Sequence, residues 1–509
     1  MISHSENTKR IAKNTLMLYG RMLFSMFVSL YTSRVILNAL GVEDYGIYGV
    51  VGGVVAMFSF LNASMAGATS RFLTFEMGRG NEQRLKDTFS SALIIHIGVG
   101  IVVFLLAETI GLWFLSNKLV IPEERIEAAH WVYQCSVVSA ILGITQVPYN
   151  ASIIAHEKMD VYAYIEILNV TLKLLIVYLL TIWDFDKLML YAILVLSVSI
   201  LVMMVYRIYC MRKFSESHFR FIWEPGIIKP MLNFSGWDFY GNMAFTFRQQ
   251  GANFLLNMFY GVALNAACGI ASTVQGVFLQ LSASVVTAFK PAIIKEYAAG
   301  KYAEMNRLLS MTTKMAMYLL MLITIVVFVR MDFILQLWLG QVPEGAVLLS
   351  RMMLVMNFFS LLGSIIMIGI HATGKVFRVG AINGTLYILT IPIMYLMLKR
   401  GMDYSACYIM FIASTLLFCV VNLQILRSQM PQFLLRSFVF RTIIPISLVL
   451  PINFIIVFWI SRFLSNGLLG FFILGLISIL VISSIGSIFI LSRSERMHIY
   501  NLIKSRISK

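Results

Sequence analysis

The sequence is dominated by apolar runs long enough to cross a lipid bilayer. A membrane-spanning helix needs about 20 mostly apolar residues, and the 509-residue chain contains fourteen such runs between charged or Gly/Pro breaks. The predicted spans are 15–38, 47–71, 88–115, 126–154, 161–182, 188–210, 230–259, 266–290, 308–330, 346–371, 379–398, 404–426, 442–461 and 468–490. We therefore expect an all-α integral membrane protein with 14 transmembrane helices.

The composition excludes several other classes of protein. Hydrophobic residues make up 59% of the chain and charged residues 13%, whereas a soluble domain carries about 25% charged residues. Five cysteines are too few for a disulfide framework in a chain of this length. The net charge of +16 would suit a nucleic-acid partner only if a soluble domain presented it. The sequence offers no such domain, and we expect no nucleic-acid partner.

The distribution of lysine and arginine predicts how the chain is oriented. Cytoplasmic loops hold an excess of these residues. With the N-terminus inside, the inner segments hold 27 of the 40 basic residues and the outer segments hold 8. An even number of spans then places both termini in the cytoplasm.

The first twelve predicted spans form an internal repeat of about 220 residues. An ordered series of small and charged residues recurs at the same predicted helix ends. It consists of Gly41, Gly46, Arg71, Glu76 and Gly80 in the first copy, and Gly261, Gly269, Lys290, Glu296 and Gly300 in the second. Further on, Lys158 recurs as Lys375. Six helices per copy make the two copies parallel, related by a pseudo-twofold axis along the membrane normal. Transporters built this way bind substrate between the halves and alternate access; a relic of gene duplication is the alternative.

This repeat predicts four regions along the chain. They are an N-terminal six-helix lobe (1–210), a cytoplasmic linker (211–229), a C-terminal six-helix lobe (230–427), and a last region (428–509) with a further linker, two additional helices and a cytoplasmic tail. The linker at 211–229 mixes basic residues with Phe214, Phe221 and Trp223. We expect it to lie on the inner membrane surface.

Basic side chains inside the predicted spans are the candidates for substrate contact. An arginine at a helix centre costs about 2.5–3.5 kcal/mol on insertion scales, so it must face a partner or water. The candidate cationic residues are Arg21, Arg34, Arg71, Lys173, Arg248 and Lys290. Helical spacing adds a polar cavity lining of Asn14, Ser25, Thr32, Asn242, Gln249 and Asn253. Snorkelling is an alternative for Arg34, and positive-inside anchoring is an alternative for Arg71 and Lys290.

Acidic groups at membrane depth are fewer. Asp238 and Glu166 are candidates for proton or sodium coupling, although an ion pair with Arg248 would explain Asp238 equally well. The sequence carries no Walker phosphate loop, no His-Glu-x-x-His and no Cys-x-x-Cys. We therefore expect no catalytic residues, no metal site, no cofactor and no enzymatic activity.

A cavity whose fixed charges are mainly arginine suits a phosphate-bearing anion. Guanidinium presents forked donors and stays charged. A lipid-linked sugar pyrophosphate fits this pattern, because its head can enter a polar lumen while its tail stays in lipid. A drug-cation exporter would need charges of the opposite sign.

The first 80 residues also carry a family resemblance. The stretches Leu30–Arg34 (LYTSR), Leu40–Tyr48 (LGVEDYGIY) and Gly67–Phe72 (GATSRF) resemble the opening of Wzx-type O-antigen and capsular polysaccharide flippases. These flippases belong to the multidrug/oligosaccharidyl-lipid/polysaccharide (MOP) exporter superfamily. The predicted layout of six, six and two helices extends the resemblance over nearly the whole chain. Arg34, Arg71 and the Gly-rich first outer turn match the pattern most closely.

The resemblance implies an activity, a location and partners. The chain would flip undecaprenyl-pyrophosphate-linked oligosaccharide across a bacterial inner membrane by alternating access. Its partners would be this lipid-linked substrate, membrane lipids, and a polysaccharide polymerase and glycosyltransferases. Three alternatives stay open, namely a lipid II-type flippase, an ion-coupled drug antiporter of the same superfamily, and a membrane-embedded glycan polymerase or ligase.

Overall fold

The structure is a computed structural model. It describes residue 14, residues 17–28, short stretches between 31 and 52, and then residues 59–118, 121–180, 185–340 and 342–489. These residues contain no β-strand, which confirms the predicted all-α class. The chain divides into two compact units, Met1–Met243 and Ala244–Lys509, and each is described by itself.

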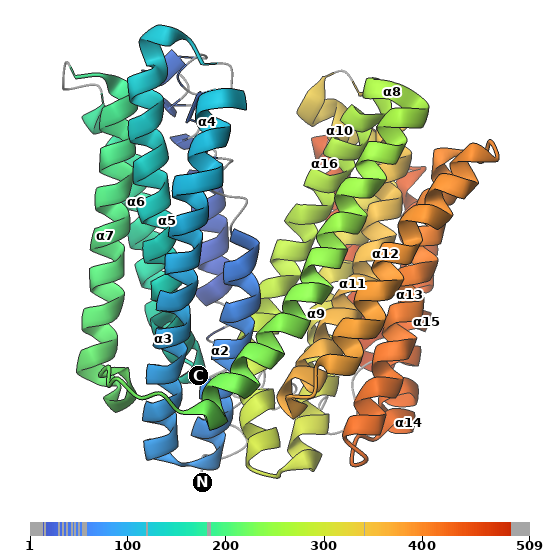
Figure 1. Cartoon of the computed structure of the whole chain (residues 1–509). Coiled ribbons are helices and arrows are strands. Elements are labelled where there is room, and N and C mark those ends of the chain that lie inside the picture. Colours follow the sequence, from blue (N-terminus) through green and yellow to red (C-terminus); the bar gives the residue numbers. More distant parts are fainter. Residues whose placement is uncertain are drawn as a thin grey trace, which may run out of the picture. The chain divides into compact units, whose positions relative to one another are not determined.

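The first unit is a helical bundle arranged around α5 (Figure 1). Its elements are α2 (Ser59–Arg79), α3 (Glu82–Leu106), η1 (Ala107–Gly111), α4 (Leu112–Lys118), η2 (Glu123–Arg125), α5 (Ile126–Ala155), α6 (Met159–Leu179), α7 (Lys187–Lys213), η3 (Ser215–Ser217) and the start of α8 (Pro225–Ala298). Helix α5 contacts α2, α3, α6 and α7. Buried aromatic and aliphatic side chains fill the centre. The rings of Phe89 and Tyr149 meet edge to face, and Tyr206 belongs to the same buried cluster.

A π-helical turn, η1, joins α3 to α4 at a point where another helix approaches closely. The Tyr133 hydroxyl of α5 donates a 2.7 Å hydrogen bond to the Ala107 carbonyl. A side chain at Gly111 would collide with this hydroxyl. The π turn and the glycine together let a buried phenol satisfy its donor inside the bundle.

The second unit contains the rest of α8 and the helices that follow. They are α9 (Tyr302–Val329), α10 (Met331–Leu339), α11 (Ala346–Thr373), α12 (Phe377–Lys399), α13 (Tyr404–Gln429), α14 (Leu435–Phe438), η4 (Val439–Ile443), α15 (Ile444–Ser461) and α16 (Leu468–Phe489). The last two long helices pack on α9. Arg330, at the end of α9, donates to the carbonyls of Ser461 and Leu464 at 2.8 and 2.9 Å. This contact fixes the C-terminal end of α15 to the unit.

Helix α8 differs from the prediction of two spans separated by a turn. The backbone from Pro225 to Ala298 is helical without a break. Side-chain contacts nevertheless show that the chain reverses in the second unit. The ring of Phe245 packs edge to face with Tyr387, and the ring of Phe259 does so with Tyr395, so this part runs in the same direction as α12.

The next part of α8 runs the other way. Tyr260 packs against Tyr404 at the start of α13, and Cys268 accepts a hydrogen bond from Tyr408, one turn further along α13. This part therefore runs in the direction of α13, which is opposite to that of α12. The reversal therefore falls between residues 260 and 268, and it uses helical backbone where the sequence predicted a loop.

Eleven helices among the described residues are long and apolar enough to cross a membrane. Their bounds follow eleven of the predicted spans to within eight residues. The predicted spans 15–38 and 47–71 lie partly outside the described residues, and 230–259 lies within α8. A multi-pass helical membrane protein is thus confirmed, while the total of fourteen stays a prediction.

The two units share local turns at the positions that the repeat predicts. Gly80 has φ +71°, and its amide donates to the Met77 carbonyl at 3.1 Å. Gly300, 220 residues later, has φ +73° and donates to the Tyr297 carbonyl at 3.0 Å. Positive φ is the conformation that glycine adopts at low cost after a helix. The repeat therefore extends from sequence to backbone geometry at this turn.

A second pair of turns matches less well in sequence. Gly374 has φ +77° after α11, and the corresponding residue after α5 is Glu157, with φ +57°. The carbonyl of Glu157 accepts a 3.1 Å hydrogen bond from the side chain of Asn14. Asn14, predicted to line a cavity, is buried and instead holds this strained turn. The predicted domain boundaries at 210, 229 and 427 stay a prediction.

Candidate functional site

Arg248 is the most enclosed of the predicted cationic residues. It lies on α8 in the second unit and is 1% exposed. Its guanidinium carbon lies 4.8–6.0 Å from four ring centroids, those of Phe245, Tyr387, Phe411 and Phe418. Aromatic faces stabilise a cation at such distances. We refer to this arrangement as the Arg248 box.

The polar contacts of Arg248 leave its charge unmatched. Nη1 donates to the Ser414 hydroxyl at 3.4 Å, and Nε has no hydrogen-bond partner. Within the described part of the chain, no carboxylate pairs with this guanidinium. A buried cation held by rings and one hydroxyl is electrostatically suited to receive an anion.

Arg21 of the first unit has a different environment. Its guanidinium lies 5.1 Å from the centroid of the Tyr162 ring. Glu166, one turn further along α6, accepts a 3.2 Å hydrogen bond from the Tyr206 hydroxyl. Arg21 and Glu166 both act electrostatically on Tyr162. The structure thus brings two predicted residues, Arg21 and Glu166, into one cluster with two tyrosines.

Three further side chains of this region, Tyr162, Tyr206 and Arg207, are not among the residues that the sequence predicted for the site. Arg207 on α7 donates to the Thr145 hydroxyl at 3.0 Å and lies 5.3 Å from the Tyr149 ring centroid. It falls inside the predicted span 188–210, close to the span's cytoplasmic end, and belongs to the 27 basic residues assigned above to the inner segments. The signal that could have found Tyr162 is its spacing of four residues from Glu166, which places both on one helix face.

The remaining predicted basic residues lie in other surroundings. Arg71 on α2 is 6% exposed and lies between the rings of Phe72 and Phe75, at 4.6 and 4.5 Å. Its counterpart Lys290 is half-buried, and Lys173 is exposed on α6. Arg34 lies outside the described residues.

The predicted polar lining is only partly brought together. Thr32 is buried, Ser25, Gln249 and Asn253 are half-buried, and Asn242 is exposed. Asp238 accepts a 3.3 Å hydrogen bond from Asn242, one turn along α8, and lies against Gly67 of α2. The alternative in which Asp238 pairs with Arg248 stays a prediction, because the two residues belong to different units.

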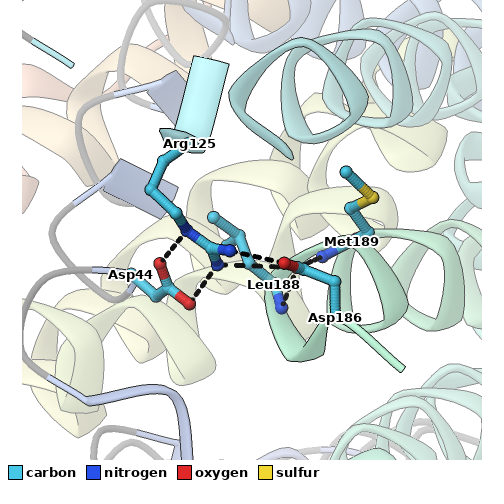
Figure 2. A network of polar contacts seen from close by, with 5 residues as sticks. All are labelled: Asp44, Arg125, Asp186, Leu188 and Met189. Carbon is cyan, nitrogen blue, oxygen red and sulfur yellow. Dashed lines mark hydrogen bonds and ion pairs between the residues drawn. The ribbon is translucent and has the colours of Figure 1, made fainter. Parts of the chain in front are cut away.

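Arg125 forms ion pairs with two carboxylates (Figure 2). It lies at the end of the first unit for which the sequence predicts the outer side of the membrane. Arg125 of η2 points between Asp44 and Asp186, with Nε 2.8 Å from Asp44 and Nη1 2.5 Å from Asp186. Asp186 also caps α7 by accepting from the Leu188 and Met189 amides, both at 3.0 Å. Burial alone would raise the pKa of Asp186, but these amides and Arg125 together hold that pKa below its usual value.

Comparisons with known proteins agree with this architecture. No protein-family model matches the chain. A curated protein of Yersinia pseudotuberculosis, named "Putative O-antigen export protein", is 27% identical over 93 residues, which cover 18% of this chain. The match spans 21% of that relative, about a fifth of its length.

Solved structures match over most of the chain. A multidrug resistance MATE family transporter of the MOP superfamily, in an outward-facing conformation, aligns with a TM-score of 0.69 at 13% identity, covering 84% of this chain and 97% of its own. A MOP superfamily transporter from Pyrococcus furiosus, described as having a binding pocket of reverse polarity, aligns with a TM-score of 0.67 at 13% identity, covering 85% and 96%. These proteins are transporters, in agreement with the prediction that the chain is not an enzyme. The chain is therefore a multi-pass membrane protein with the fold of the MOP superfamily transporters.

Proposed function

We propose that the chain is a flippase for a lipid pyrophosphate-linked oligosaccharide, an O-antigen or capsular polysaccharide precursor. It would move this substrate from the cytoplasmic to the periplasmic leaflet of a bacterial inner membrane, with both of its termini in the cytoplasm. The observation that carries the proposal is the Arg248 box, because its buried guanidinium has aromatic and hydroxyl neighbours and pairs with no carboxylate among the described residues.

The chemistry of the substrate complements that site. A pyrophosphate offers several anionic oxygens to forked guanidinium donors, and aromatic faces suit the apolar faces of sugars as well as the cation itself. Arg248 is closed to solvent in this conformation. Contact with substrate therefore requires α8, α12 and α13 to separate within the second unit, in addition to the movement of one half against the other that alternating access involves.

Two findings from the comparisons support the class of substrate. The curated protein that matches part of the chain is named for O-antigen export. One transporter of similar structure is described as having a binding pocket of reverse polarity. The fold thus occurs with binding pockets of different charge. The cationic residues Arg21, Arg71, Arg207 and Arg248 support a carrier of anions rather than an exporter of drug cations.

The driving force follows from charge. Moving one elementary charge through 100 mV is worth about 2.3 kcal/mol, so an inside-negative potential would favour export of a pyrophosphate. Glu166 and Asp238 stay candidates for ion coupling. Glu166→Gln and Asp238→Asn should leave potential-driven flipping intact if they have no coupling role, and should abolish its response to a proton or sodium gradient if they do.

The direct test uses purified protein in proteoliposomes. A fluorescent undecaprenyl-pyrophosphate oligosaccharide is added, and its arrival in the opposite leaflet is read by a membrane-impermeant quencher. We expect flipping that is lost with an uncharged alcohol-linked analogue. Efflux of a cationic dye without flipping of the oligosaccharide would instead support the drug antiporter, and flipping of lipid II alone would support the other branch.

A cellular test separates the same alternatives. Arg21→Ala and Arg248→Ala should reduce surface glycan and leave drug susceptibility unchanged. The reverse outcome would contradict the proposal. Elongated glycan made in vitro by the purified protein would support a polymerase or ligase. The proposed partners, a polysaccharide polymerase and glycosyltransferases, would be sought by crosslinking in cells that make the glycan.

A further inference from the structure

The segment between α7 and α8 carries a surface that the proposed transport does not use. We define the linker surface as the exposed side of residues 212–229. One side of this segment is fixed to the first unit. The His156 ring stacks on Phe214 at 3.9 Å, and its Nε2 lies 2.7 Å from Oε1 of Glu216, which is buried. The Arg220 amide donates to the Ser90 hydroxyl of α3 at 3.2 Å.

The other side of the segment presents large aromatic rings. Phe219, Phe221 and Trp223 are 47%, 78% and 65% exposed. The backbone from 219 to 224 forms no helix, and residues two apart in an extended segment lie on the same side. Three rings on one side form an apolar strip of a kind that marks an interaction surface.

Basic residues surround these aromatic rings. Arg212, Lys213, Arg220 and Lys229 are all exposed, and Glu224 is half-buried. The buried carboxylate of Glu216 is already engaged by His156. The linker surface is therefore aromatic and cationic, which complements an apolar boundary that carries negative charge.

The position of the segment identifies that boundary. Helix α7, a candidate membrane span, ends at Lys213, so the linker begins where the chain leaves the hydrocarbon core. Tryptophan favours the headgroup level of a bilayer, phenylalanine lies on the apolar face of interfacial segments, and basic clusters next to a span bind anionic lipids. We propose that the linker surface binds anionic phospholipid headgroups of the adjacent leaflet, with Trp223 and its two neighbouring phenylalanines at the acyl boundary.

The position of Trp223 can be measured directly. The other six tryptophans, Trp113, Trp131, Trp183, Trp237, Trp338 and Trp459, are replaced by phenylalanine, and the purified protein is placed in nanodiscs. Phospholipids brominated near the top of the acyl chain should quench Trp223, and aqueous iodide should not. Quenching by iodide alone, or shielding from both quenchers by protein, would overturn the proposal.

The role of charge is tested in nanodiscs that contain phosphatidylglycerol and phosphatidylcholine, with either lipid brominated in turn. Brominated phosphatidylglycerol should quench Trp223 more strongly. The variant R212Q/K213Q/R220Q/K229Q should lose that preference, by up to about fivefold per basic side chain. The matched control K187Q/K399Q/R400Q/R462Q removes four exposed basic residues from other loops and should retain it.

Equal quenching by both lipids, unchanged in the linker variant, would contradict the headgroup site. Monodisperse elution of both variants shows that they are folded. The measurement requires no transport, so the inference can fail or hold independently of the proposed function.

Discussion

The two units hold their intramembrane arginines in different ways. Arg21 of the first unit shares a cluster with Glu166, Tyr162 and Tyr206. Arg248 of the second unit is surrounded by aromatic rings and one serine hydroxyl. A nearby carboxylate offsets the cost of a guanidinium at membrane depth, whereas rings offset only part of it. We therefore expect the loss of Arg248 to affect transport more than stability, and the loss of Arg21 to affect both.

The largest expected effect is on transport when Arg248 is removed. Arg248→Met keeps the volume and removes the charge, and we expect flipping to fall about ten- to a hundredfold, as for the loss of a charge-assisted hydrogen bond. Arg248→Lys should recover only part of the rate, because lysine lacks the planar fork. Initial flipping rates in proteoliposomes measure both.

The control for this variant is Arg462→Met, which removes an exposed arginine that lies 5.0 Å from the Phe458 ring. It should flip at the wild-type rate. The comparison between the units would fail if Arg248→Met flipped normally while melting at a much lower temperature, since Arg248 would then be structural.

Arg125 extends the comparison to an arginine whose charge is fully matched. Arg125→Met leaves Asp44 and Asp186 facing each other, and we expect it to lower the free energy of unfolding by about 1–2 kcal/mol, discounted for partial exposure. Thermal unfolding in detergent measures the loss. Substituting Asp44 by Asn in the same variant should restore part of it.

The pH dependence of this network has a defined sign. Since the folded-state pKa of Asp186 lies below its usual value, its stabilising contribution is present above the unfolded pKa of about 3.9. The contribution is lost as the pH falls through the lower, folded value. The melting temperature of the wild type should therefore fall more steeply below about pH 4 than that of Arg125→Met. Parallel curves for the two proteins would show that the network has no such linkage.

A smaller effect should distinguish Arg21 from Arg248 through the free energy of unfolding, without a transport measurement. Arg21→Met and Glu166→Gln should show a coupling of about 1 kcal/mol in a double-mutant cycle, because each stabilises the other's charge through the tyrosine cluster. Arg248→Met combined with Glu166→Gln should be additive. Equal coupling in both cycles would remove the distinction between the units.

The smallest expected effect concerns the turn that the two units share. Gly80→Ala and Gly300→Ala should each destabilise by about 1 kcal/mol, because both residues have positive φ. An added Cβ meets no atom within 4 Å at either site, so the cost is backbone strain alone and should be equal. Unequal costs would show that the matching backbones are held by different surroundings.

Much of the fold could be predicted from the sequence. The spans from 126 to 154 and from 346 to 371 agree with α5 and α11 to within two residues, and the glycine pair of the repeat adopts the same φ. The reversal within α8 falls between the predicted spans 230–259 and 266–290, but its helical backbone was not predicted, since Gly261 and its neighbours indicate a loop. The sequence indicates candidates such as Arg21 and Arg248, because a charged residue within an apolar run is conspicuous. It does not indicate which side chains surround them.

The sequence by itself determined that the chain has many apolar helices long enough to cross a membrane and which of them carry basic residues, because hydrophobicity and charge act locally along each helix. Only the tertiary structure decided the partner of each charge. Tyr206 lies 40 residues from Glu166, and Ser414 lies 166 residues from Arg248. Contacts over such separations depend on which helices pack together and how each is rotated, and the periodicity of a single helix does not contain that information.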